Sequence, residues 1–478
     1  WQNNRQVGMR KDAVFVEGIF EELDAPGEWF LDRATHMLYY YPPAGLDLAH
    51  ATFEGVGPAS LVEFRGTEAH PVRNVSFEGF VFQRTARTFM QNREPLLRSD
   101  WTTFRGGAVF ALGTEGCSIR GCFFDAVGGN AVFVSGFNRH FTVGECRIEN
   151  AGANGVAFVG DPKAVRSPLF EYNQRHRLAE IDRHPGPKTD DYPSDCLVDD
   201  CLIARTGRIE KQSAPVEISM SRRITVRDCS IYDVPRAGIN IGDGCWGGHL
   251  IEGCDVFDTV KETGDHGSFN SWGRDRYWGL TGVDLNDLDR AGLDDLPLLD
   301  VVEPITLRHN RWRCDHGWDI DLDDGSSNFR IVDNLCLHGG LKLREGFHRV
   351  CENNVIVGNS FHMHVWFKDS HDVIERNIVF TPYQVIEVPK PWGDACDYNL
   401  LHLPKVKSPI PADMLAALSG RDSHSVASDA EFVDAATGDY RVQPGSPALK
   451  LGFKNFATDR FGVRSATLRR LAKTPVLP

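Results

Sequence analysis

The segment from residue 314 to residue 325 carries the densest set of side chains that could do chemistry. It reads Cys-Asp-His-Gly-Trp-Asp-Ile-Asp-Leu-Asp-Asp-Gly, so acidic and apolar residues alternate. Such alternation predicts a strand with one inward and one outward face. The inward residues would be Cys314, Trp318, Ile320 and Leu322, and the outward ones Asp315, Asp319, Asp321 and Asp323. Carboxylates this close repel one another, so the row needs a cation, a basic neighbour or a catalytic use.

Neighbouring segments supply bases and aromatic residues for the same face. Aligning Ile320, Leu341, Met363 and Ile386 as equivalent positions gives two outward columns, the first Asp321, Lys342, His364 and Glu387, the second Asp323, Arg344 and Trp366, with Asp319 and His362 beside them. The preceding Gly-rich stretch adds Asp265, His266, Asn270, Trp272 and Arg274. One outward Asp or His is usually just solvated, but successive segments that converge on one face favour a saccharide-binding active site.

These residues must be positioned by a repeat of roughly two dozen residues. Five copies end in a cysteine, at Cys122, Cys146, Cys201, Cys229 and Cys254, and four later copies have Asn instead, at Asn310, Asn334, Asn354 and Asn377. Each copy alternates apolar and polar residues, and a second short strand follows it. A period of this length made of strands predicts an all-β fold, a right-handed parallel β-helix. Two longer spacings, before Cys201 and before Asn310, fit either two coils or one coil with an insertion.

Register also predicts what the cysteines do. Equivalent positions of a solenoid stack about 4.8 Å apart, so the five cysteines would form an inward column of buried thiols. The asparagines would continue that column as an amide ladder. Twelve cysteines would permit six disulfides in a secreted chain, but a stacked column is better explained as core than as crosslinks. Spacings typical of metal-binding Cys and His are absent from the sequence.

Composition excludes other classes of protein. The 478 residues include 52 Lys plus Arg and 66 Asp plus Glu, a net charge of −14, which makes nucleic acid an unsuitable partner. An apolar run long enough to span a membrane is missing. The chain begins with Trp1 and shows no leader pattern. We expect three parts: residues 1–60 with a hairpin, residues 61–400 as the β-helix and residues 401–478 as a cap. Insertions at 161–195 and at the acidic stretch 276–304 would be solvated lateral loops.

The motifs around these residues resemble glycoside hydrolase family 141, a family of parallel β-helix enzymes with α-L-fucosidase and xylanase activities. The similar stretches are 20–30, 38–43, 264–275, 315–328, 340–345 and 359–366. The resemblance as a whole covers most of the chain, and the middle motifs are its most specific part. Members of the family usually have additional β-helical residues before the first stretch, so the resemblance implies that this chain is a fragment or lacks its first coils. It also implies a pair of catalytic aspartates, a carbohydrate substrate from plants or algae, and a secreted or periplasmic location.

Glycosidases need two carboxyl groups across the scissile bond. We expect Asp321 to be the nucleophile or base and Asp265 the general acid, with Asp319 and Asp324 as close substitutes. Residues expected to bind the sugar are His266, Asn270, Trp272, Arg274, Lys342, Arg344, His362, His364, Trp366 and Glu387. One-rung and two-rung separations would fit retaining and inverting chemistry respectively, and the sequence leaves both open. The enzyme would require no cofactor and act as a monomer, without nucleic-acid or membrane partners.

Two alternatives stay open at this point. A polysaccharide lyase would hold Ca²⁺ with Asp319, Asp321 and Asp323 and abstract a proton with Lys342 or Arg344. A carbohydrate-binding solenoid without activity would need none of these carboxylates for catalysis.

Overall fold

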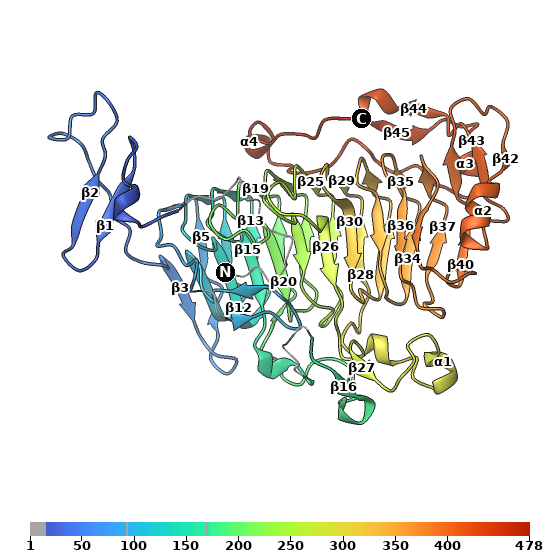
Figure 1. Cartoon of the computed structure of the whole chain (residues 1–478), viewed down its shortest axis with the longest axis horizontal. Helices are drawn as coiled ribbons and strands as arrows, with labels where there is room; N and C mark the ends of the chain where they lie inside the picture. Colours follow the sequence, from blue (N-terminus) through green and yellow to red (C-terminus); the bar gives the residue numbers. More distant parts are fainter. Residues whose placement is uncertain (1–15, 92–93, 168–170, 172) are drawn as a thin grey trace. The chain divides into compact units, whose positions relative to one another are not determined.

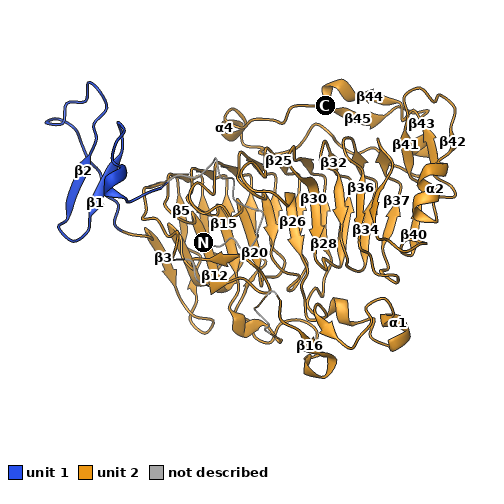
Figure 2. Cartoon of the chain, in the orientation of Figure 1, with its two compact units in different colours: residues 1–57 blue, residues 58–478 orange. Residues whose placement is uncertain are grey.

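The computed structural model describes residues 16–91, 94–167, 171 and 173–478. It separates into two compact units, residues 1–57 and residues 58–478 (Figure 2). The first 15 residues of the predicted N-terminal part lie outside the described residues. Within the first unit, β1 (Trp29–Asp32) pairs antiparallel with β2 (Met37–Tyr40), which confirms the predicted hairpin. A short helix, η1 (Phe20–Glu22), places Phe20 against Tyr39 at 4.9 Å between ring centroids.

The second unit is a parallel β-helix whose coils contribute strands to three long sheets (Figure 1). The sheet that carries the predicted chemistry, called here the site sheet, has the strand order β3 (Val62–Arg65), β9 (Val109–Glu115), β12 (Val132–Arg139), β15 (Val156–Val159), β20 (Val216–Ser219), β23 (Ile239–Ile241), β26 (Gly267–Trp272), β30 (Trp318–Asp323), β33 (Leu341–Leu343), β36 (Phe361–His364) and β39 (Gln384–Ile386), with β4 (Val72–Arg73) and β17 (Pro193–Ser194) at its side. The described strands of this sheet pair in parallel, as expected for a solenoid.

The other two sheets complete each coil. The second sheet consists of β5 (Ser76–Glu78), β10 (Ser118–Arg120), β13 (Thr142–Gly144), β18 (Leu197–Asp199), β21 (Thr225–Arg227), β24 (Leu250–Glu252), β28 (Ile305–Arg308), β31 (Phe329–Val332), β34 (Arg349–Glu352), β37 (Val373–Glu375) and β40 (Ala395–Asp397). The third consists of β6 (Val81–Gln83), β11 (Phe123–Asp125), β14 (Arg147–Glu149), β19 (Leu202–Ala204), β22 (Ser230–Tyr232), β25 (Asp255–Phe257), β29 (Arg311–Arg313), β32 (Leu335–Cys336), β35 (Val355–Ile356), β38 (Ile378–Val379), β41 (Leu400–His402), β43 (Val426–Ser428) and the antiparallel β42 (Ile410–Pro411). The predicted all-β solenoid is confirmed.

Both long spacings in the repeat are single coils with insertions. β14 pairs directly with β19, and β25 pairs directly with β29, so no coil lies between them. The inserted segments contain η2 (Pro162–Ala164), β16 (His176–Arg177), η3 (Leu178–Glu180), β27 (Leu280–Thr281), α1 (Leu288–Ala291) and η4 (Leu296–Leu298). They associate with each other, because β16 pairs with β27 and the His176 ring nitrogen Nε2 lies 2.7 Å from the main-chain oxygen of Arg276.

The C-terminal residues cover the last coil and then run back along the solenoid (Figure 1). α2 (Asp413–Ser419) contributes Leu415 to the main hydrophobic core. The remaining elements are β44 (Phe432–Asp434), η5 (Ala435–Thr437), β45 (Asp439–Val442), α3 (Pro447–Lys450) and α4 (Ala466–Arg469). Far back on the third sheet, the main-chain N–H of Val463 donates to Ser230 Oγ at 3.1 Å. None of the described helices is long and apolar enough to cross a membrane.

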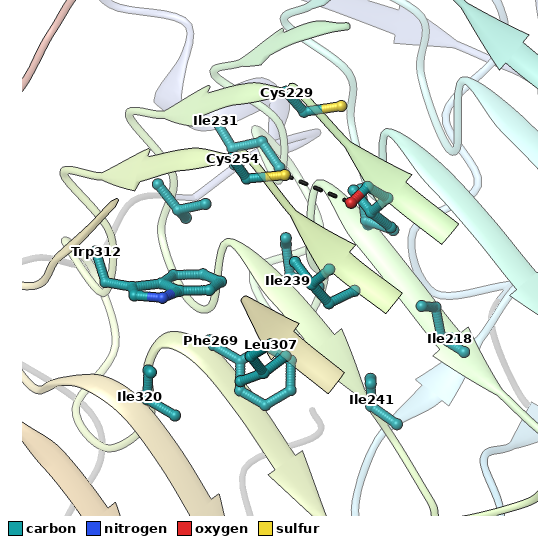
Figure 3. Close-up of a cluster of buried hydrophobic side chains, with 14 of the residues drawn as sticks. Ile218, Cys229, Ile231, Ile239, Ile241, Cys254, Phe269, Leu307, Trp312 and Ile320 are labelled. Carbon is teal, nitrogen blue, oxygen red and sulfur yellow. Dashed lines mark hydrogen bonds between the residues drawn. The ribbon is translucent and has the colours of Figure 1, made fainter. Parts of the chain in front are cut away.

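The interior is built of stacked columns of like residues (Figure 3). All twelve cysteines lie within the described residues, and they are buried thiols outside any disulfide. The predicted column is present, and the thiol of Cys254 donates to the main-chain oxygen of Val226 at 3.6 Å. Burial raises the pKa of Cys201 and Cys229 well above the ordinary value. These cysteines are therefore core residues.

The asparagine ladder continues the column as predicted and reaches one coil further, to Asn399. Each amide Nδ2 donates to the Oδ1 of the next coil, with distances of 3.1 Å from Asn310 to Asn334, 3.1 Å from Asn334 to Asn354 and 3.0 Å from Asn354 to Asn377. The second hydrogen of each amide is donated to a main-chain oxygen, for example from Asn354 to Ile331 at 2.8 Å. The ladder thus satisfies main-chain groups that the solenoid corner leaves unpaired.

Replacing one rung of this ladder should destabilise the whole second unit. Asn354→Ala removes the acceptor for the main-chain N–H of Asn334 and for its amide, and it orphans the oxygen of Ile331. We expect the free energy of unfolding to fall by about 2–4 kcal/mol, since each unsatisfied buried group costs about 1–3 kcal/mol. Chemical denaturation followed by circular dichroism measures the loss. The control Asn286→Ala alters an exposed amide and should cost under about 1 kcal/mol; equal losses in both variants would refute the explanation.

Candidate functional site

The candidate site lies on the outer face of β26, β30, β33 and β36. Its central column holds Asn270, Asp321, Lys342, His362 and Gln384, which are paired in register across successive strands. The inward neighbours Phe269, Ile320, Leu341 and Phe361 belong to the hydrophobic core, so these side chains point away from it. Five coils, from Asn270 to Gln384, therefore meet on one face.

The predicted alignment of this face was wrong by two residues in β36. Leu341 pairs with Phe361 and Leu343 pairs with Met363, so His362, and not His364, stands beside Lys342. His364 pairs with Ile386 and follows Arg344 in the second column. A shift of two residues preserves the inward and outward faces of a strand, and both Phe361 and Met363 are apolar. The sequence pattern alone therefore fits both registers.

Lys342 connects the two central aspartates. Its Nζ lies 3.0 Å from Asp321 Oδ1 and 2.9 Å from Asp323 Oδ1, and 4.3 Å from the centroid of the Trp318 ring. Although burial opposes its charge, the carboxylates of Asp321 and Asp323 raise the pKa of Lys342 above the ordinary value. The side chain is 5 % exposed and stays an ammonium.

The surroundings separate the two aspartates chemically. Burial raises the pKa of Asp321 well above its ordinary value, against the attraction of Lys342 and with the help of the charges on Asp323 and Asp265. Asp323 is also buried, yet Lys342, His266 and Arg344 lower its pKa. Asp321 thus favours the neutral form at a pH where Asp323 is ionised. Such divergence is typical of acid and base pairs in active sites.

A network of ion pairs closes one flank of this face. Arg344 Nη1 lies 2.7 Å from Asp324 and 3.4 Å from Asp323, and its Nε lies 2.7 Å from Glu345. Arg274 approaches Asp324 at 2.8 Å from the other side. Asp324 is therefore held between two guanidinium groups, an arrangement typical of a structural ion pair. The predicted Arg274 likewise contacts Asp324 and the Trp272 ring.

Two histidines line the opposite flank. His362 and His364 are half-buried, and the Trp318 ring lies 6.3 Å and 6.1 Å from their centroids, edge-on. Burial, followed by the charge of Lys342, lowers the pKa of both rings, to about 4 for His364. Nε2 of each ring has no hydrogen-bond partner among the described residues. Neutral imidazoles with a free nitrogen suit the recognition of hydroxyl groups.

The loop before β26 brings in the third carboxylate. Asp265 and His266 have φ angles of 74° and 84°, the largest positive values of any non-glycine residue in the described part of the chain. Consecutive left-handed residues store strain, which is common at functional sites. Asp265 is 25 % exposed, and its Oδ2 lies 3.8 Å from Nδ1 of the buried His266. The charge of Asp265 raises the pKa of Asp321, so the two carboxyl groups interact electrostatically.

Two residues of this loop's surroundings escaped the sequence analysis. Arg236 Nη2 lies 3.1 Å from His266 Nδ1, and its guanidinium stacks over Trp101 at 5.0 Å. Trp101 follows β7 (Glu94–Pro95), precedes β8 (Thr102–Thr103) and packs 5.4 Å from Trp272. Trp101 is 165 residues before His266 in a segment without the repeat, so no periodic signal could place it there.

The structure places four predicted residues differently. Asp319 is wholly buried and accepts main-chain hydrogen bonds from Cys314, His338 and Gly340 at 2.7–3.3 Å, because β30 begins at a corner. Trp318 consequently points outward and contacts Lys342. Trp366 is core, with Nε1 donating to the Leu343 oxygen at 2.8 Å. Glu387 is exposed in the turn after β39.

A second acidic cluster lies outside this face. Cys245, Asp275 and Asp300 could bring ligand atoms within 4.8 Å of one another. Their positive partners are already present, since Arg276 donates to both oxygens of Asp300 at 2.8 and 2.9 Å and Arg98 Nη1 lies 3.7 Å from Asp300. Asp300 is thus a buried, paired residue within a stretch that was predicted to be a solvated loop. The cluster is explained by its arginines.

Comparisons with known proteins establish the fold and leave the activity open. Residues 107–276 match the family model described as a right handed beta helix region. This match supports the right-handed parallel β-helix, and it does not single out glycoside hydrolase family 141. No curated protein matches the chain.

A solved structure titled "Glycoside hydrolase" is similar over 73 % of this chain and 57 % of its own, with 14 % identity and a TM-score of 0.48. This chain spans little more than half the length of that protein. A likeness of this degree carries no argument about activity.

The raised pKa of Asp321 should make stability depend on pH. The folded carboxyl, with a pKa of about 8, keeps its proton where the unfolded one, near 3.8, has lost it. The folded state therefore binds more protons, and its stability falls as pH rises from about 4 to 8, by at most about 1.4 kcal/mol per unit. We expect Asp321→Asn to flatten this slope in urea unfolding at pH 5–8. The exposed Asp315→Asn should retain it; identical slopes in wild type and Asp321→Asn would contradict the assignment.

Proposed function

We propose that the outer face of β26, β30, β33 and β36 hydrolyses glycosidic bonds of a plant or algal polysaccharide or oligosaccharide. The observation that carries the proposal is the pair Asp321 and Asp265: Asp321 is a buried carboxyl whose pKa is raised, and Asp265, a quarter exposed, is close enough for its charge to act on it. Hydrolysis of a glycoside requires a protonated carboxyl group and an ionised one on either side of the bond. The resemblance to family 141 adds fucosidase-like or xylanase-like specificity to this proposal.

In this proposal Asp321 is the acid, which exchanges the roles first expected for Asp265 and Asp321. Burial favours the protonated form of Asp321, whereas a base or nucleophile must be ionised. Asp321 gives its proton to the glycosidic oxygen as the bond to the anomeric carbon breaks. Asp265, a quarter exposed on its loop, is the carboxylate that activates water or attacks that carbon. Asp323 forms ion pairs with Lys342 and Arg344 at 2.9 and 3.4 Å. Its role in this proposal is to offset the charges of these two side chains.

Access to Asp321 sets a requirement on Lys342. The Asp321 side chain is 1 % exposed, and the Lys342 ammonium lies between it and the Trp318 ring. Substrate must therefore displace Lys342 from Asp321 towards Asp323 or its own hydroxyl groups. Trp318 then offers an aromatic surface for a sugar ring, and the free Nε2 atoms of His362 and His364 are placed to bind its hydroxyls.

The lyase alternative has weaker support. Both oxygens of Asp319 already accept main-chain hydrogen bonds, from Cys314, His338 and Gly340, and Lys342 stands between Asp321 and Asp323. These three aspartates therefore do not fit a shared Ca²⁺ site. The raised pKa of Lys342 also disfavours it as a base. We propose further that the protein acts as a monomer outside the cytoplasm, where such polysaccharides occur.

Activity on a panel of glycosides tests the proposal. We expect wild-type protein to release sugar from aryl α-L-fucosides, aryl xylosides or plant and algal polysaccharides, without the ultraviolet absorbance of an unsaturated uronide and without loss to a chelator. Asp321→Asn and Asp265→Asn should each lower kcat by about 100-fold or more, since acid–base groups contribute about 10²–10⁴.

The matched control is Asp315→Asn, an exposed aspartate that pairs with Arg313 and should keep full activity. Circular dichroism and denaturation establish that each variant is folded. Unchanged turnover in Asp321→Asn would sink the acid assignment, and an unsaturated product would support the lyase instead. Binding without turnover of any glycoside would support a carbohydrate-binding solenoid.

A further inference from the structure

A buried polar column joins Asp321 to a fourth acid. Glu217, Asn240, Asn270 and Asp321 are paired in register on β20, β23, β26 and β30. The four residues are at most 2 % exposed although they point away from the core. Glu217 and Asn240 lie upstream on the face that the sequence analysis singled out, and neither has a role in the hydrolysis described above. A buried column of acid, amide, amide and acid must find its hydrogen bonds within itself.

The hydrogen bonds of this column all point one way. Asn240 Nδ2 donates to Glu217 Oε1 and Oε2, both at 3.0 Å, and Asn270 Nδ2 donates to Asn240 Oδ1 at 2.8 Å. Asn270 therefore turns its oxygen towards the strand that carries Asp321. That oxygen has no hydrogen-bond partner among the described residues, and the same is true of Asp321 Oδ2. Two acceptors thus occupy adjacent rungs, about 4.8 Å apart along the sheet.

Counting donors decides what closes this gap. Between the two acids there are three gaps and only two amides, and each amide donates on one side and accepts on the other. If both amides turn over, the unsatisfied gap moves to Glu217 and does not disappear. If Asn270 alone turned over, it would lose its hydrogen bond to Asn240, and the two amide oxygens would face each other. Every arrangement therefore leaves one pair of facing buried acceptors, which would each cost about 1–3 kcal/mol, and a proton on an acid relieves the pair only when the gap is next to that acid. In the arrangement seen, the gap is at Asp321.

We propose that Glu217, Asn240 and Asn270 are positioning residues that hold one proton on Asp321, where its O–H donates to Asn270 Oδ1. This inference deepens the proposed hydrolysis and rests on it for its purpose. In the reaction, the O–H bond of Asp321 breaks as the proton passes to the glycosidic oxygen. The carboxylate left behind faces Asn270 Oδ1 and is disfavoured, so it regains the proton that the consumed water loses. That proton comes directly from the water if Asp265 has attacked the sugar, or by way of Asp265 if Asp265 has activated the water, and the column returns to its starting state.

Other charged groups also act on Asp321, and the test must separate them from the column. Lys342 on β33, Asp323 on β30 and Asp265 on the preceding loop all face it. Asn240→Leu leaves these three in place and cuts the column. Asn270 is then free to turn and donate its Nδ2 to Asp321, which lowers the pKa of Asp321, although the added apolar surface alone would raise it. The direction in which the pKa of Asp321 changes therefore distinguishes the effect of the hydrogen-bonded column, called here the relay, from the effect of burial.

Infrared difference spectroscopy with isotope-labelled aspartate measures the protonated carboxyl without any substrate. We expect wild-type protein at pH 6 to show a buried protonated carboxyl band that is lost in Asp321→Asn. Asn240→Leu should lower the midpoint of that band by at least one pH unit, a tenfold loss of proton affinity. Glu217→Gln, which keeps shape and can donate to Asn240, should act in the same direction and serves if Asn240→Leu does not fold. Gln384→Leu, at the exposed end of the same column, is the matched control and should change nothing.

Three outcomes overturn the inference. One is an ionised Asp321 in wild type at pH 6, another is an unchanged midpoint in both column variants, and the third is a midpoint that rises in Asn240→Leu. The spectra do not depend on turnover. A protein that hydrolyses no glycoside yet shows the expected shifts would therefore refute the proposed function and leave the relay standing.

Discussion

Parallel, in-register stacking of coils is the constraint on which this molecule depends. A spacing of about 4.8 Å places each side chain against its equivalents in the coils before and after it. Similar side chains therefore form columns, and each column must be compatible with itself. The interior columns consist of apolar residues, thiols and amides, because each of these groups makes favourable contacts with another of its own kind. The outward face can hold other chemistry, but it is bound by the same spacing.

That spacing explains the electrostatics of the candidate site. Asp321 and Asp323 leave the same strand on the same side, and Asp321 is in register with Lys342 on β33. A second acid in the next rung would add repulsion, whereas Lys342 neutralises both at 3.0 and 2.9 Å. One ammonium shared by two carboxylates leaves an excess of negative charge in a dry place. Protonation of the more buried carboxyl, Asp321, relieves it. The unequal pKa values thus follow from stacking, burial and the count of charges.

The structural features that recur in every coil could be predicted from the sequence, whereas features that occur only once could not. The columns at Cys122 to Cys254 and at Asn310 to Asn377 were predicted because one residue type recurs at one phase of each coil. The register predicted for β36 was wrong. Phe361 and Met363 are both apolar, so burial in the core fits two alignments that differ by two residues.

Single events outside the repeat account for the other misses. Asp319 lies at a corner, where main-chain N–H groups capture its carboxylate, and strand alternation fails there. Trp101 and Arg236 reach His266 from segments whose folding back depends on tertiary packing alone. The sequence therefore predicted that Asn270, Asp321 and Lys342 share one face, while the residues that flank this face could be identified only from three-dimensional contacts.

The two amide columns of this chain show how position in the fold converts the same side chain into different chemistry. An asparagine inside the solenoid reaches the main-chain oxygens of a neighbouring coil, as Asn354 does with Ile331, so its ladder closes without a titratable group. Asn240 and Asn270 lie on the outward face of β23 and β26, and among the described residues their side chains hydrogen-bond only along their own column. A buried column whose side chains form no hydrogen bonds with main-chain groups can satisfy all its acceptors only if it ends in titratable groups. Glu217 and Asp321 are the acids at its two ends. An arrangement of amides that only stabilises the main chain in the core can therefore hold a proton on the outer face of the site sheet.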